Sequence, residues 1–145
     1  MREIKFRFYD KKNKDMNYCD LEDLCEDDYW FDGETDVWSA LYDSNNEQNR
    51  FVAMEYTGLK DKNGKEIYEG DIIKIIDIEY QTKHIAIIEF LEASFIMHMI
   101  KGEFAGEILG ADSWLDEEKE VIGNIYDNKN LLGGKNGQDW SWRIC

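Results

Sequence analysis

The chain has 145 residues, of which 43% are hydrophobic and 14% aromatic, and it contains no proline. Its 32 acidic and 17 basic side chains give a formal net charge of −15 at pH 7. This charge argues against a protein that binds nucleic acid or an anionic membrane surface, because such proteins bind these negative ligands through lysine and arginine. The aromatic and apolar content predicts a folded chain with a hydrophobic core.

The first 19 residues predict a β-hairpin. Ile4, Phe6 and Phe8 alternate with charged residues, as in a strand with one buried face, and a second short strand is expected over 16–19 after a polar loop at 10–15. The segment carries six basic and three acidic side chains, a net charge of +3. This alternation argues against a signal peptide. No apolar run approaches the roughly 18 residues of a membrane span, so we expect a cytoplasmic protein.

The next segment, residues 20–49, concentrates the negative charge. It carries eleven acidic side chains and no basic one. Tryptophan within such a loop is typical of an interaction surface, because it supplies a large contact area. We therefore predict a partner surface made of Asp27, Asp28, Trp30, Asp32, Glu34, Asp36 and Trp38. The five carboxylates of this set also leave open a loose metal site, for which a solvated acidic loop is the alternative.

Short strands separated by turns are expected from residue 51 onward. The pattern predicts strands over 51–56, 72–78, 84–91, 95–100 and 121–126. The isoleucine-rich run at 72–78 is expected to be covered on both faces, because only two of its seven residues are charged. Strands of this length and spacing indicate a small barrel or sandwich.

Turn and helix signals complete the pattern. Asn63-Gly64 lies between apolar arms and favours a type I′ turn. Helix is scarce: Leu21, Leu24 and Cys25 have helical spacing only briefly, and Ser113 begins a capping-box pattern before a turn or two of helix over 117–121.

The chain is expected to be mainly β, with little helix and three parts. An N-terminal hairpin with the acidic segment occupies 1–50, a small β-barrel domain 51–130 and a C-terminal tail 131–145. Glycine supports the first boundary, because only Gly33 precedes residue 50 and ten glycines follow it.

Three blocks carry a resemblance to a known family. They are MREIKFR at residues 1–7, YTGLKDKNGKEIYEGDI at 56–72 and VIGNIY at 121–126. In this order they resemble the YopX family of phage and prophage proteins, over the chain from residue 1 to about 132. The resemblance implies a mainly β protein with an SH3-like barrel, encoded by a phage or prophage of Gram-positive bacteria. It implies no activity.

The residues of the middle block make sense as architecture. Gly58, Gly64 and Gly70 each lie where a turn needs positive φ, and Asp71 is expected to accept a backbone hydrogen bond before the next strand. After the last block the family has Asn-Pro-Glu-Leu-Leu, where this chain has NKNLL at 128–132 and therefore lacks the proline that starts a helical turn.

No catalytic, cofactor-binding or metal site is predicted. The sequence has neither a phosphate-binding glycine loop nor an EF-hand with its oxygen ligands in register. His84 and His98 lie within apolar strands, where packed or edge residues are expected rather than a base. Cys19, Cys25 and Cys145 have no paired spacing, so reduced thiols are expected.

Two classes of function remain. The first is a non-enzymatic accessory protein that binds a host or phage protein, including the version in which the acidic segment mimics nucleic acid and occupies a basic groove. The second is direct nucleic-acid binding by the barrel, because EGDIIKI at residues 69–75 is similar to the opening of KOW-type SH3-like modules. The acidic charge disfavours the second. Homo-oligomers are possible through an exposed strand edge.

Overall fold

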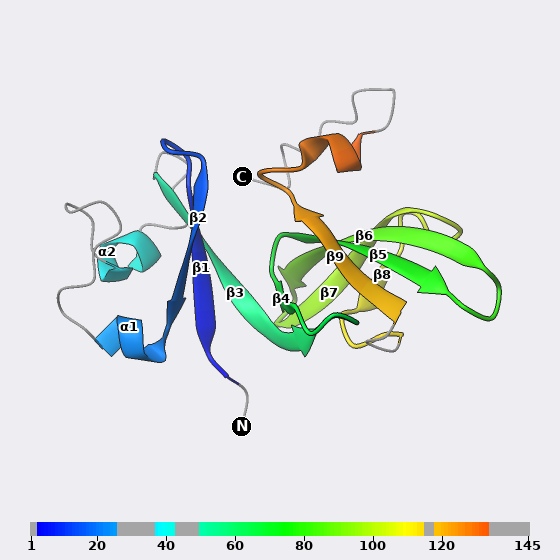
Figure 1. Ribbon diagram of the computed structural model, residues 1–145, viewed down its shortest axis with the longest axis horizontal. Helices are drawn as coiled ribbons and strands as arrows, with labels where there is room; N and C mark the ends of the chain where they lie inside the picture. Colours follow the sequence, from blue (N-terminus) through cyan, green and yellow to red (C-terminus); the bar gives the residue numbers. More distant parts are fainter. Residues whose placement is uncertain (1–2, 26–36, 43–49, 115–117, 134–145) are drawn as a thin grey trace. The chain divides into compact units, whose positions relative to one another are not determined.

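The computed structural model describes residues 3–25, 37–42, 50–114 and 118–133. The described part of the chain is mainly β with very little helix, and its strands form two antiparallel sheets. The strand orders are β2-β1-β3-β4 and β8-β7-β6-β5-β9 (Figure 1). The chain divides into two compact units, Met1–Tyr56 and Thr57–Cys145, and each is described by itself.

The first unit contains the predicted hairpin and two short helices. Its elements are β1 (Lys5–Asp10), β2 (Asp15–Asp20), α1 (Leu21–Cys25), α2 (Val37–Tyr42) and the first part of β3 (Phe51–Lys60). Both helices pack on one face of the sheet, because Leu24, Val37 and Ala40 share a buried cluster with Phe8 and Phe51.

Helix α1 begins with a reciprocal cap. The Asp20 carboxylate accepts the N–H of Asp23 at 3.0 Å, and the Asp23 carboxylate accepts the N–H of Asp20 at 3.0 Å. These bonds satisfy backbone donors that the first helical turn leaves without partners. The helical spacing of Leu21, Leu24 and Cys25 is thereby confirmed as a helix of little more than one turn.

The second unit holds the remaining strands. After β3 come β4 (Glu66–Tyr68), β5 (Asp71–Asp77), β6 (Thr82–Leu91), β7 (Ser94–Lys101), β8 (Ile108–Gly110), β9 (Lys119–Asn124) and the 3₁₀ helix η3 (Lys129–Leu132). The expected strands are confirmed within a few residues of their ends. The five-stranded sheet is compatible with the SH3-like barrel that the resemblance implies.

The predicted coverage of the isoleucine run on both faces is confirmed only as far as Ile75, because Ile76 and Ile78 are 38% and 64% exposed. Ile73 and Ile75 belong to one buried cluster with residues of β6 and β7. Ile72 belongs to a second cluster, in which Leu132 of η3 is also buried. The NKNLL segment therefore forms a helical turn without the family's proline, and its leucines close one face of the sheet.

Three predicted positive φ values are confirmed, although Gly58 lies within β3 rather than in the predicted turn, and one predicted turn type is corrected. Gly58, Gly64 and Gly70 have φ of 86°, 79° and 85°. Asn63 has no positive φ, so the predicted type I′ turn at Asn63-Gly64 is wrong. Gly64 instead donates its N–H to Asp61 O at 2.9 Å, closing a turn centred on the two residues between them.

A two-residue turn with positive φ at both positions occurs between β6 and β7 instead. Glu92 and Ala93 have φ of 49° and 64°, and Leu91 pairs directly with Ser94. Neither residue favours this conformation. The register of two long strands, each packed into the core, overrides the local preference.

Where the structure describes the helix expected over 117–121, only Glu118 is helical, in a 3₁₀ turn, and the residues after it are strand. β9 begins at Lys119, and its ladder with β5 places Lys119 opposite Ile75. The Lys119 ammonium is buried and donates to Ala111 O at 2.8 Å. This burial and the strand pairing outweigh the local capping signal of Ser113.

Gly102 lies against the fully buried His84. A Cβ built on Gly102 would lie 2.4 Å from His84 Nδ1 and 2.9 Å from the Lys83 carbonyl oxygen, and its φ is +108°. The His84 ring also stacks on Trp114, at 5.5 Å between ring centroids. His84 is thus a packed residue of the core, and His98 is buried as well.

We expect Gly102→Ala to lower the free energy of unfolding by about 3 kcal/mol, from backbone strain and overpacking together. Gly106→Ala is the matched control: its φ is +93°, but a Cβ there meets nothing within 4 Å. It should lose only the strain component, about 1–2 kcal/mol. Urea unfolding of both variants measures the difference, and equal losses would show that the approach to His84 has no energetic effect.

Candidate interaction surface

The predicted partner surface is described only at one of its residues. Asp27, Asp28, Trp30, Asp32, Glu34 and Asp36 lie outside the described residues. Trp38 lies in α2, and 58% of its surface is exposed. Its part in binding a partner stays a prediction.

Helix α2 presents two aromatic residues to solvent. Val37 and Ala40 are buried, whereas Trp38 and Tyr42 are 58% and 87% exposed. Residues four apart lie on the same face of a helix, so Trp38 and Tyr42 form one outward face, which we call the α2 surface. Sequence reasoning missed Tyr42, although its spacing from Trp38 carries the signal.

The α2 surface lies in the most acidic part of the sequence. Helix α1 packs on the same sheet face as α2, and Glu22 and Asp23 lie in its first turn. The segment 20–49, which contains both helices, has eleven acidic side chains and no basic one. The α2 surface therefore offers large, partly apolar contact area within the segment of the sequence that carries the most negative charge.

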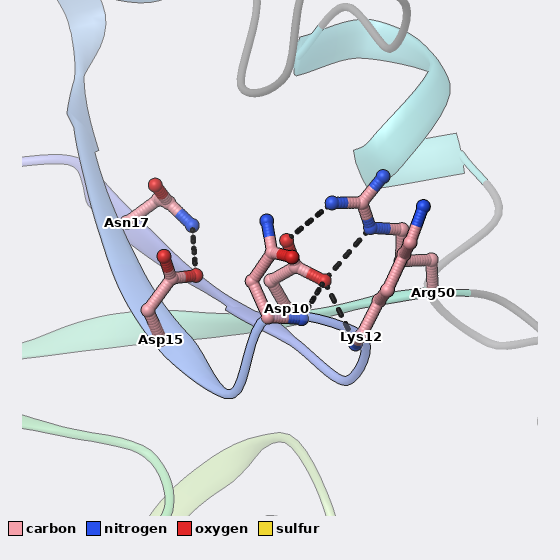
Figure 2. Close-up of polar contacts among 6 residues, drawn as sticks. Asp10, Lys12, Asp15, Asn17 and Arg50 are labelled. Atoms are coloured by element: carbon pink, nitrogen blue, oxygen red, sulfur yellow. Dashed lines mark hydrogen bonds and ion pairs between the residues drawn. The ribbon is translucent and has the colours of Figure 1, made fainter.

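An ion pair fixes the point where the acidic segment returns to the sheet. Arg50 directly precedes β3, and its guanidinium donates to both carboxylate oxygens of Asp10, at 2.8 and 2.7 Å. Asp10 also accepts the N–H groups of Lys12 and Asn13, at 2.9 and 3.2 Å (Figure 2). The backbone adds a further bond, from Lys11 N–H to Arg50 O at 2.9 Å.

These contacts change the titration of Asp10. The hydrogen bond from Arg50 is the largest cause that lowers its pKa, and the N–H groups of Asn13 and Lys12 act in the same direction against the effect of burial. A carboxyl whose pKa is lower in the folded state stabilises the fold above its ordinary pKa of 3.8. This stabilisation is lost as pH falls below that value.

Two cysteines of the first unit lie in different environments. Cys19 is buried in the core of the first unit, and burial, with the nearby Asp23 and Asp20 carboxylates, raises its thiol pKa to about 11. Cys25, at the end of α1, is exposed.

Over the described ranges no group of three His, Cys, Asp or Glu residues could hold a metal ion. No helix in those ranges is long and apolar enough to cross a membrane.

The fold and this surface define a small, mainly β protein of two units that displays aromatic residues beside an acidic segment. The sequence profile of the YopX protein family matches residues 5–133, and the chain belongs to that family.

Two solved structures are similar to the chain. Protein yopX from Bacillus subtilis matches with a TM-score of 0.58 and 20% identity, over 92% of this chain and 98% of that one. Protein EF1440 from Enterococcus faecalis matches with a TM-score of 0.51 and 20% identity, over 92% of this chain and 100% of that one. At this identity the likeness shows the fold alone. A comparison with curated proteins gave no match.

Removing Arg50 should destabilise the protein. We expect Arg50→Met to cost about 2–4 kcal/mol at pH 7, because it leaves a nearly buried carboxylate without its charged partner. The gap to wild type should narrow as pH falls from 3.8 through the lowered pKa of Asp10 in the folded state, where its carboxylate becomes protonated. Urea unfolding of both proteins at pH 7 and pH 3 measures this difference in the free energy of unfolding. The control, Lys12→Met, alters an exposed side chain of the same turn and should change stability by no more than about 0.5 kcal/mol. A gap independent of pH would contradict this account.

The two thiols should differ in reactivity. With iodoacetamide at pH 8, we expect rapid labelling of Cys25 and none of Cys19 in the folded protein, because Cys19 is both buried and protonated at that pH. Tandem mass spectrometry assigns the label to each site, and labelling in urea should modify both equally. Equal rates in the folded protein would show that the first unit opens on the timescale of the reaction.

Proposed function

We propose that the protein is a phage- or prophage-encoded accessory protein that acts in the cytoplasm of its bacterial host by binding a host or phage protein, without catalysing a reaction. The α2 surface carries this proposal. Trp38 and Tyr42 are large, exposed and on one helix face, although burying them would be favourable.

The chemistry of this surface selects the partner. Tryptophan and tyrosine are the residue types that most often dominate binding energy when a partner buries them. The acidic segment of the sequence that contains them would attract a basic partner and speed the encounter. We therefore infer a partner with an apolar recess for the two aromatic rings and a basic rim around it.

Nucleic-acid mimicry is a second candidate for the same surface. It is supported by the spacing of eleven carboxylates over thirty residues with no lysine or arginine among them. A mimic would occupy the groove in which a host protein binds DNA, so duplex DNA would compete with it. A partner that is merely steered by charge would not depend on the order of the acidic residues.

The proposal predicts loss of binding in the double variant Trp38→Ala/Tyr42→Ala. Affinity capture from lysate of host cells, quantified by mass spectrometry, should recover a specific protein with wild type and at least about tenfold less with the variant. Tyr80→Ala is the matched control, because Tyr80 is 70% exposed in the other unit and its removal should leave recovery unchanged. Equal recovery with the double variant, or no partner at low salt, would overturn the proposal.

The two candidates are separated by permuting residues 26–36 at constant composition. This change spares the buried residues Leu24, Val37 and Ala40, which hold both helices on the sheet. Mimicry predicts loss of capture and competition by duplex DNA, whereas steering predicts capture as strong as that of wild type.

A further inference from the structure

Strand β8 forms one edge of the five-stranded sheet. The hydrogen bonds on either side of it show which of its backbone groups face β7. Met97 pairs with Leu109. On either side of this pair, Met99 N–H donates to Glu107 O at 2.9 Å and Ala111 N–H donates to Phe95 O at 3.1 Å. Bonding alternates along an antiparallel ladder. The N–H and C=O of Leu109 therefore face β7, and those of Ile108 and Gly110 point away from the sheet.

These outward groups are largely unused. Gly110 O accepts the N–H of Ser113 at 2.9 Å. Within the part of the chain that the structure describes, Ile108 N–H, Ile108 O and Gly110 N–H have no hydrogen-bond partner. The Ile108 side chain is 51% exposed at the same position.

The opposite edge of the same sheet is blocked. On β9, the Asp61 carboxylate accepts Val121 N–H at 2.9 Å, and Lys119 O accepts Lys62 N–H at 2.9 Å. Further along, Asn124 N–H donates to the Asn128 side chain at 3.1 Å. Covering the backbone groups of a sheet edge prevents unwanted pairing, so an edge with uncovered backbone groups beside a covered one is a candidate for strand addition.

The charge around β8 indicates what would pair with it. Residues 102–112 contain Glu103, Glu107 and Asp112 and no basic residue, and all three carboxylates are exposed. Asp112 lies at the edge itself, because its Oδ1 would be 2.6 Å from a Cβ built on Gly110. Opposite charges across neighbouring strands stabilise pairing, and like charges oppose it.

We propose that the open edge of β8 binds an extended, basic segment of a partner protein by adding it as an antiparallel strand. The N–H and C=O of Ile108 and the N–H of Gly110 make the backbone bonds. The segment's apolar residues cover Ile108, and its lysine or arginine residues lie near Glu107 and Asp112. This site lies in the second unit and does not depend on the α2 surface.

Fluorescence anisotropy with the full chain tests the proposal. The probe is a labelled octapeptide of alternating lysine and valine. We expect saturable binding that Ile108→Pro weakens by about tenfold, because proline removes one outward donor yet is tolerated on an edge strand. Ile108→Thr keeps the N–H and a β-branched side chain and should stay within about threefold of wild type.

Two further peptides exclude simple attraction to the acidic segment. An octapeptide with the same four lysines but proline in place of two valines should bind at least about tenfold more weakly, because it cannot complete the ladder. An octapeptide of alternating glutamate and valine should not bind wild type. It should bind the variant Glu107→Lys/Asp112→Lys, which also covers the case in which Ile108→Pro fails to fold.

Amide hydrogen exchange gives the local readout. With the lysine-valine peptide bound, the N–H groups of Ile108 and Gly110 should exchange more slowly, whereas that of Leu109, already bonded to β7, should change little. Trp38→Ala/Tyr42→Ala should bind this peptide like wild type, so the two proposals fail separately. Equal affinity for the lysine-proline peptide, or no slowing at Ile108 and Gly110, would overturn the assignment.

Discussion

A buried aspartate that accepts backbone N–H groups organises the first turn of each unit. Asp10 accepts two N–H groups of its own turn, and its carboxylate also pairs with Arg50. Asp61 does the same in the second unit, with Asn63 and Lys65 N–H groups on Oδ1 and Val121 N–H on Oδ2. In both cases one carboxylate holds a tight turn and ties it to a segment at least 40 residues away in sequence. A single side chain thus fixes local and long-range structure together.

The two edges of the five-stranded sheet follow from this arrangement. Asp61 and the neighbouring backbone lie along β9 and occupy its outward groups, so the turn that Asp61 organises also protects that edge. Nothing equivalent lies along β8 in the described ranges, where the outward groups are those of Ile108 and Gly110. The sheet is consequently asymmetric in its capacity for pairing. Helix α2 of the first unit is also two-sided, because one of its faces is buried in the core and the other exposes aromatic residues.

Local patterns in the sequence predicted the strands, the burial of β5 as far as Ile75 and the positive φ of three glycines, because each depends largely on residues adjacent in the chain. They failed where distant groups decide. The Asn63-Gly64 turn changes type because the Asp61 carboxylate binds Asn63 N–H, and the β6–β7 turn adopts positive φ because strand register imposes it. The pairing of Asp10 with Arg50, the burial of Lys119 and the exposure of Tyr42 also depend on tertiary structure. Of the predicted surface, the structure describes Trp38 alone.

If α2 binds a partner as proposed, its brevity links that binding to the stability of the first unit. Helices of fewer than about 12 residues are marginal in water, and α2 has six, so its form depends on Val37 and Ala40 packing against Phe8 and Phe51. A ligand that binds only the formed helix therefore stabilises that whole core by mass action. The reverse also holds: a substitution at Phe8, which no partner could reach, would weaken binding by lowering the population of the competent helix. Under the proposed function, recognition and folding of this unit would thus be one coupled equilibrium.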